Sequence, residues 1–158
     1  MKLRILCLVA LLLWVVGAVL VGWVFVKGWT MPGADKRLHV LLAPAERDQV
    51  LGEMRLLLKA VHGVVTGLGS QDQQADRKQA EQAARSAGMG MAADVNPALM
   101  AKLPLPFKQM GMSVHKDFDG LADAIAQGET PAQIMHRLAS ITGRCTTCHD
   151  LYRLPAGP

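Results

Sequence analysis

The chain has 158 residues, a formal net charge of +4 and only 4% aromatic residues. This length suits one domain of ordinary size. Three of the 17 basic residues (Lys2, Arg4 and Lys27) flank an N-terminal apolar segment, so the rest of the chain carries 14 basic against 13 acidic residues. The near-neutral balance and the scarcity of aromatic rings argue against a nucleic-acid-binding protein, which needs a clustered basic face and stacking platforms.

The first element in chain order is an apolar run over residues 5–26. At about 1.5 Å per residue, a helix of this length crosses the roughly 30 Å hydrocarbon core of a bilayer. Trp23 and Trp29 near its end suit the membrane interface. A cleaved signal peptide would have a shorter apolar region and a small-x-small cleavage site. We therefore predict an uncleaved transmembrane signal anchor over residues 1–29, with Cys7 as an inert apolar residue within it.

Residues 30–43 read as a linker, and residues 44–158 carry the pattern of four amphipathic helices. These are expected over residues 44–69, 70–86 and 106–127, with a fourth beginning at Pro131. Residues 88–104 form a long connection with room for a short helical turn. Strand-type alternation is not found, so we predict an all-α domain, an antiparallel four-helix bundle preceded by one transmembrane helix.

Capping boxes and apolar spacing support these helices. Ser70 with Gln73, and Thr130 with Gln133, match the pattern that opens a helix. The second helix has an alanine-rich inner face. The inward stripe predicted for the first helix is Leu51, Met54, Leu58, Val61, Val65 and Leu68. For the third helix it is Phe107, Met110, Val114, Phe118, Leu121 and Ile125. For the fourth helix it is Ile134, Leu138, Ile141, Cys145 and Cys148.

The fourth helix carries the motif Cys145-Thr146-Thr147-Cys148-His149. C-x-x-C-H is the attachment signature of c-type haem. On a helix the two cysteines lie one turn apart, so both sulfurs reach the same porphyrin edge. His149 follows directly and can become an axial ligand of the iron. The motif therefore predicts one covalent haem c, attached to Cys145 and Cys148, with His149 as a metal ligand.

Three other interpretations of the motif stay open. A thioredoxin-like pair normally opens a helix after a strand, where the helix dipole lowers the thiol pKa, and this pair lies late in a helical pattern. A zinc site needs four ligands, and the sequence holds no second C-x-x-C or H-x-x-x-H. A structural disulfide would give His149 no role. The first of these would make the chain a membrane-anchored thiol–disulfide oxidoreductase, whereas the haem interpretation predicts that it is not an enzyme.

A four-helix pattern with C-x-x-C-H on its last helix resembles the cytochrome c prime family and its low-spin relatives. The resemblance covers about residues 40–156 and rests on the motif, on Tyr152-Arg153 and on the third-helix stretch FKQMGMSVHKDFDGLADAI. It implies that the haem lies inside the bundle between the first and last helices. It also implies that a first-helix side chain faces the second side of the iron, and that two bundles commonly pair as a homodimer.

Met54 and Leu51 are the candidates for that first-helix position. A methionine there implies a six-coordinate electron carrier, because a thioether is an axial haem ligand that raises the reduction potential. A leucine there implies a five-coordinate haem that binds small gases such as nitric oxide. Aligning Met54 with the family's ligand position favours methionine as the second metal ligand, whereas aligning Arg47 with a family arginine puts Leu51 over the iron.

The remaining candidates are basic side chains. Arg153, or Arg144 in its place, is expected to pair with a haem propionate, since a guanidinium suits a carboxylate. His62 is expected at the surface, and His115 and His136 on partly solvated faces.

The attachment of c-type haem takes place on the outer face of an energy-transducing membrane. We therefore predict a single-pass protein of the bacterial inner membrane with its haem domain in the periplasm. Its expected role is electron transfer with membrane redox partners, in which the protein sets the potential and the iron changes valence.

Overall fold

The computed structural model describes residues 2–69, 73–93 and 95–156 and is mostly helical. The helices are α1 (Lys2–Lys27), α2 (Pro44–Gly69), α3 (Gln73–Ser86), α4 (Met89–Ala92), α5 (Pro97–Lys102), α6 (Leu105–Ala126) and α7 (Pro131–Leu151), and the strands are β1 (Thr30–Pro32), β2 (Leu38–Val40) and β3 (Tyr152–Arg153). The long helices follow the predicted ranges closely. The cap expected at Ser70 lies outside the described residues.

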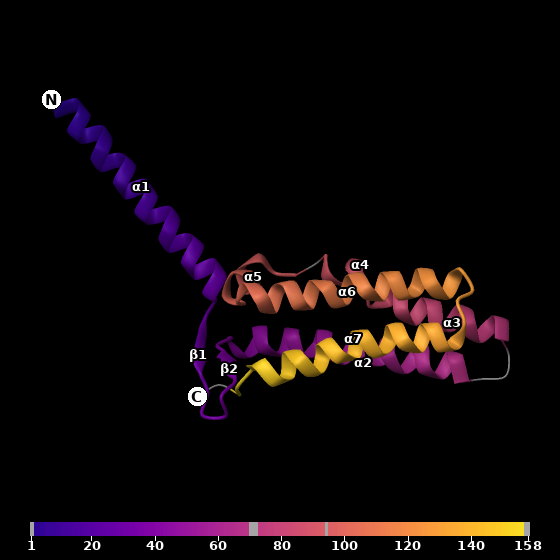
Figure 1. Ribbon diagram of the computed structural model, residues 1–158. Coiled ribbons are helices and arrows are strands. Elements are labelled where there is room, and N and C mark those ends of the chain that lie inside the picture. The colour runs from indigo at the N-terminus through magenta and orange to yellow at the C-terminus, as the bar shows by residue number, and fades with distance from the viewer. Residues whose placement is uncertain (1, 70–72, 94, 157–158) are drawn as a thin grey trace.

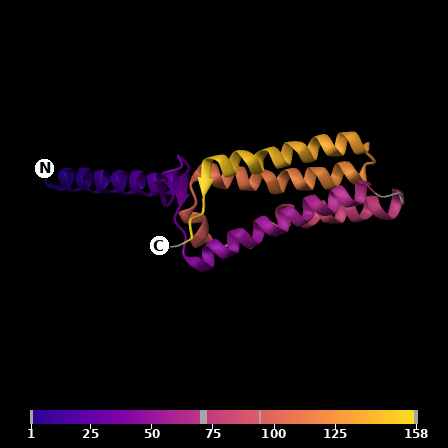
Figure 2. The same ribbon diagram turned by 90° about the horizontal axis from the view of Figure 1, so that it is seen from below.

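Helices α2 to α7 form one elongated helical body, from which α1 projects (Figure 1). α2 packs against α3, α3 against α6, and α6 against α7. Figure 2 shows the orange α6 beside the yellow α7, and the magenta α2 beside α3. Among the described residues, α2 and α7 do not make the extensive backbone contacts that α2 makes with α3.

The buried face of α2 differs from the predicted stripe. Leu58 and Val65, expected inside, are 68% and 44% exposed. The buried residues are instead Val50, Ala60, Val64 and Gly67. The reason is the close approach of α3, since a Cβ added to Gly67 would lie 2.9 Å from the Cβ of Ala80. Helices this close leave room only for small side chains between them, so Leu58 and Val65 lie outside, while Val61 and Leu68 are half-buried at the edge of the distal cluster.

The apolar side chains of the helical body form two clusters. The larger one, which we call the distal cluster, comprises Ala60, Val64, Ala80, Ala84, Ala87, Val114, Phe118, Leu121, Ala122, Ile125, Ile134, Leu138 and Ile141. The smaller one, the strand-side cluster, comprises Val40, Val50, Leu99, Leu103, Phe107 and Tyr152. The predicted stripes of α6 and α7 supply seven of the thirteen residues of the distal cluster and Phe107 of the strand-side cluster, which confirms the pattern for these two helices.

A small three-stranded sheet lies at the end of α7, and its presence overturns the expectation that the chain has no strands. β1 and β2 form an antiparallel hairpin with Thr30 opposite Val40. β2 pairs in parallel with β3, with Leu38 opposite Tyr152. Residues 30–43, expected as a linker, therefore hold a hairpin that pairs with the far end of the chain. Strands of two or three residues are too short to show alternation in a sequence.

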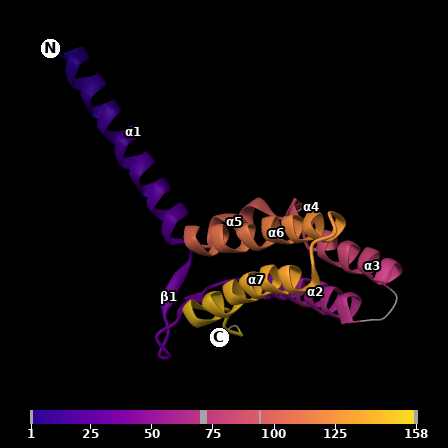
Figure 3. The same ribbon diagram turned by 45° about the vertical axis from the view of Figure 1, so that its right-hand side comes forward.

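α1 is long and apolar enough to span a membrane, and its residues are exposed. This agrees with a membrane anchor or a signal sequence. The C-terminal end of α1 meets the helical body (Figure 3). There the ammonium of Lys108 donates to the carbonyl of Phe25 at 3.1 Å and lies 3.5 Å from the centre of its ring. The amide of Trp29 donates to the carbonyl of Lys102 at 2.7 Å. A cation at the last turn also opposes the negative end of the helix dipole.

Gly28 is the residue on which this junction depends. Its φ is +63°, and an added Cβ would lie 2.5 Å from the carbonyl oxygen of Lys102. We therefore expect Gly28→Ala to weaken the junction by more than about 1 kcal/mol, because alanine is strained in that conformation and collides with backbone. Gly17→Ala is the matched control, since nothing lies within 4 Å of its added Cβ. The measurement is the rate of tryptic cleavage at Lys27 in detergent. Equal rates in the two variants would contradict the expectation.

Candidate functional site

The C-x-x-C-H motif lies in the last two turns of α7. The helix begins at a complete capping box, in which the Thr130 hydroxyl accepts from the Gln133 amide and the Gln133 side chain accepts from the Thr130 amide. It ends at Tyr152, where the backbone becomes extended. Cys145 and Cys148 continue the face that buries Ile134, Leu138 and Ile141 and are themselves half-buried. The two cysteines therefore extend the predicted stripe of α7 to the end of the helix, where the burial of that face is only partial.

Both thiols are free, and the pKa of each is raised above its usual value. Burial raises the pKa of Cys145 above its usual range. Burial, with a smaller effect from the neighbouring Cys145, raises the pKa of Cys148 to about 11. The Cys145 thiol also lies 3.6 Å from the carbonyl oxygen of Ile141, a weak hydrogen bond within the helix. Reactive cysteine pairs have the opposite character, a pKa below the usual value.

Met54 and Cys148 both pack against the strand-side cluster. Both are half-buried and pack against its buried residues, although they lie on α2 and α7. Within that cluster the rings of Phe107 and Tyr152 make an edge contact at 5.2 Å between centroids. Leu51 is half-buried as well, but among the described residues it belongs to neither cluster. Met54, and not Leu51, therefore packs against the same cluster as Cys148.

His149 lies on the exposed side of α7. Its backbone carbonyl accepts a hydrogen bond from Nη1 of Arg37 at 3.3 Å. The structure therefore does not bring the imidazole to Met54. An exposed side chain can change its rotamer without displacing packed neighbours, so this placement does not conflict with a ligand role.

The two candidate arginines both pair with carboxylates. Nη1 of Arg153 lies 3.4 Å from Oδ2 of Asp35. Nη2 of Arg144 lies 2.9 Å from Oδ2 of Asp117. Because Arg153 is 53% exposed, its single long contact is weak and leaves most of the guanidinium free to bind another anion.

The other histidines are only partly as predicted. His62 is exposed, as expected. His115 was expected on a partly solvated face but is buried, with Nδ1 at 2.8 Å from the carbonyl oxygen of Ala87. The correction follows from the packing of the connection after α3 over α6, which covers this side of the helix. His136 is exposed near the start of α7, remote from the motif in sequence.

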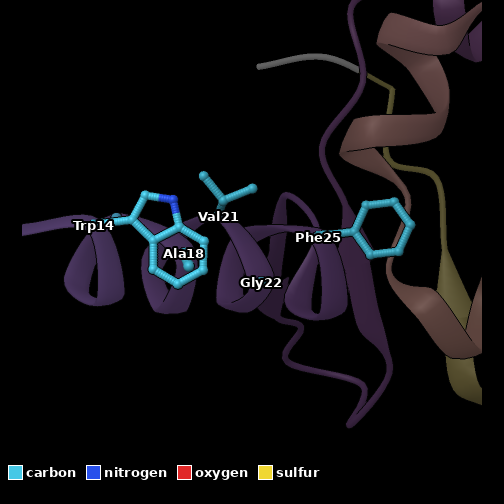
Figure 4. Close-up of a pocket in the computed structure, with 6 residues that line it drawn as sticks. Trp14, Ala18, Val21, Gly22 and Phe25 are labelled. Carbon is cyan, nitrogen blue, oxygen red and sulfur yellow. The ribbon is translucent and has the colours of Figure 1, made fainter. Parts of the chain in front are cut away.

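A shallow groove on α1 is separate from these residues. It is lined by Trp14, Gly17, Ala18, Val21, Gly22 and Phe25 (Figure 4). The small glycine and alanine residues form the floor of the groove, and the rings of Trp14 and Phe25 lie at its two ends. The lining offers no ligand for a metal and no acid or base. The groove is therefore suited to apolar contact and not to the chemistry of the motif.

Sequence reasoning missed Asp35 and Arg37, which lie in the turn between β1 and β2. Asp35 accepts from Nε and Nη2 of Arg37 at 2.9 and 2.7 Å. The hydrogen bond from Arg37 is the main reason that the pKa of Asp35 is lowered to about 2. The dipeptide Pro32-Gly33 is a turn signal and could have indicated this hairpin, but not its contact with the motif.

Comparisons with models of protein families, with curated proteins and with solved structures found no match to this chain. Within the described residues, no three His, Cys, Asp or Glu side chains gather into a group that could hold a metal ion. The zinc interpretation of the motif therefore gains no support from the fold. What the site can do follows from its own residues.

Proposed function

We propose that this chain is a membrane-tethered c-type cytochrome that transfers electrons through one covalently bound haem. The observation that carries the proposal is that Met54 on α2 and Cys148 on α7 both pack against the strand-side cluster, which connects a second candidate ligand with the proposed attachment point through one cluster. A methionine and a histidine together form one of the ligand pairs known for c-type haem.

The fit of the haem to these residues is supported by two further features. Cys145 is half-buried but, among the described residues, packs against neither apolar cluster. Around the helical body, α2 neighbours α3, α3 neighbours α6, α6 neighbours α7, and α7 neighbours α2. Of these four pairs, α2 and α7 pack least closely on each other. The resemblance to the cytochrome c prime family places the haem between its first and last helices, and this is the same pair within the proposed antiparallel four-helix bundle.

Each residue then has a role. Cys145 and Cys148 would hold the porphyrin by thioether bonds, and both side chains are half-buried on the same face of α7. His149 and Met54 are the proposed axial ligands, and the exposed side of Arg153 is the proposed partner of a propionate. The bound iron supplies the chemistry of gaining and losing one electron. The strand-side cluster keeps water from one side of the site and so favours a stable ligand geometry.

The rival proposals are weaker on these observations. A thiol–disulfide oxidoreductase needs a thiolate, and the raised pKa of both cysteines opposes its formation. A gas-binding haem protein needs Leu51 over the iron, and Leu51 does not share the packing around Cys148. We further propose that α1 anchors the protein in a bacterial inner membrane, with the bundle in the periplasm and a membrane redox partner within reach.

Optical spectra of the purified full-length protein test the proposal. The protein is produced in cells that mature c-type cytochromes and examined in the ferric and ferrous states. We expect haem that survives denaturation, and a ferric spectrum of the low-spin type with a methionine-to-iron band at the red end. A high-spin ferric spectrum would favour the gas-binding alternative. A colourless protein with two alkylatable thiols at the motif would overturn the proposal.

A further inference from the structure

The hairpin formed by β1 and β2 holds the end of the helix that carries the motif. β2 pairs with β3 directly after α7, with His39 opposite Arg153. From the turn of the hairpin, Arg37 donates from Nη1 to the carbonyl oxygen of His149 at 3.3 Å. A residue that precedes the helical body in the chain therefore contacts the backbone of the proposed iron ligand.

Arg37 is itself fixed by Asp35. The carboxylate accepts from the Arg37 side chain at 2.7 and 2.9 Å and from the Arg37 amide at 3.2 Å. The same carboxylate lies 3.4 Å from a guanidinium nitrogen of Arg153. The side chains of Arg37 and Asp35 are only 35% and 33% exposed, so the protein shields about two thirds of each. A guanidinium held this way loses little freedom when it bonds the helix end.

The charges in this group do not cancel. Two guanidinium groups share one carboxylate, which leaves a net positive charge beside the last turn of α7. His39 adds a further titratable ring, with Nε2 at 3.7 Å from Oδ1 of Asp35. A positive charge near a haem iron favours the reduced state, because that state carries one positive charge less.

We propose that Arg37 is a positioning residue for His149, and that the net positive charge of the group formed by Asp35, Arg37 and Arg153 raises the reduction potential. The inference rests on the proposed function, since it assigns His149 to the iron. Arg37 fixes the backbone of the ligand through the carbonyl, and it opposes the negative end of the α7 dipole. The segment expected as a linker is then part of the haem site.

Reduction potentials of charge variants test the electrostatic part. At pH 7 and low salt, we expect a downward shift for Arg37→Gln and an upward shift for Asp35→Asn, because the two remove opposite charges. Both shifts should shrink at high salt, since partly exposed charges are screened. Arg137→Gln is the matched control, because Arg137 forms a similar fork with Glu129 at the start of α7. Its potential should equal that of the unaltered protein. Shifts of the same sign in Arg37→Gln and Asp35→Asn, or no shifts, would overturn the charge assignment.

Amide hydrogen exchange tests the positioning part. We expect amides in the last turn of α7 to exchange about three- to tenfold faster in Arg37→Gln, as one hydrogen bond and one cap are lost. Arg37→Lys separates the two effects, because lysine keeps the charge but not the planar fork. It should keep a potential close to that of the unaltered protein while exchanging as fast as Arg37→Gln. Unchanged exchange in Arg37→Gln would overturn the positioning role.

The two proposals fail differently. If the unaltered protein holds no covalent haem, the proposed function is wrong, and the exchange experiment alone decides whether Arg37 holds the end of α7. If haem is attached but the reduction potentials of Arg37→Gln and Asp35→Asn equal that of the unaltered protein, the proposed function stands. The charge assignment of Arg37 and Asp35 is then wrong.

Discussion

Replacing Cys145 and Cys148 together with alanine is expected to abolish covalent haem attachment completely. Alanine has no sulfur, so neither thioether bond can form. Both positions are half-buried within α7, and alanine is the strongest helix former, so the helix should persist. The measurement is haem staining after denaturing electrophoresis of protein made in cells that mature c-type cytochromes, with circular dichroism to show that the helices remain.

The chain offers its own control for this experiment. Cys7 is an exposed cysteine in α1, outside the motif. Cys7→Ala should stain as strongly as the unaltered protein. Undiminished staining of the Cys145→Ala, Cys148→Ala double variant would show that haem is held elsewhere or not covalently.

The long helices could be predicted because each carries local signals. Thr130 and Gln133 form the cap expected of them, and Gly128 follows the end of α6 with a φ of +84°, a conformation that glycine adopts readily. The spacing of Ile134, Leu138 and Ile141 likewise follows one face of α7 and is buried as predicted. Such features depend on residues within one or two turns, so they are visible in sequence alone.

Two parts of the fold could not be predicted, because they depend on tertiary contacts. The inner face of α2 is decided by how closely α3 approaches, and this turns Leu58 and Val65 outward. The hairpin of β1 and β2 is local, but β2 also pairs with residues more than a hundred positions later, Leu38 opposite Tyr152. The spacing of apolar residues in the sequence shows neither how closely two helices approach nor which distant strands pair.

The candidate site likewise has parts that local sequence signals predict and parts that depend on distant contacts. The motif itself is local, and the inward direction of Cys145 and Cys148 follows from helical spacing. The contact of Arg37 with the His149 carbonyl is nonlocal, and an arginine in a turn has no pattern that distinguishes it. Met54 is intermediate: its place on the inner side of α2 could be predicted, but its packing against the same cluster as Cys148 needed the structure.

Replacing Met54 with leucine is expected to convert the haem from low spin to high spin. Leucine has a similar volume and should preserve the packing, at a cost below about 1.5 kcal/mol, but it has no sulfur to bind the iron. We expect loss of the methionine-to-iron band from the ferric spectrum. We also expect a fall in reduction potential on the order of 100 mV, since axial ligands vary the potential over about 0.8 V.

Met100→Leu is the matched control, because Met100 is half-buried against the same strand-side cluster and lies on α5. If methionine acts as core filler at both positions, the two variants will have the same spectrum, and the role proposed for Met54 is wrong. If the unaltered protein is already high spin, Leu51→Ala decides the alternative, because a smaller side chain over a vacant iron face should speed nitric oxide binding. The two leucine variants thus separate iron ligation from packing. Leucine preserves the packing at both positions, so only a position where the sulfur binds the iron should change the spectrum.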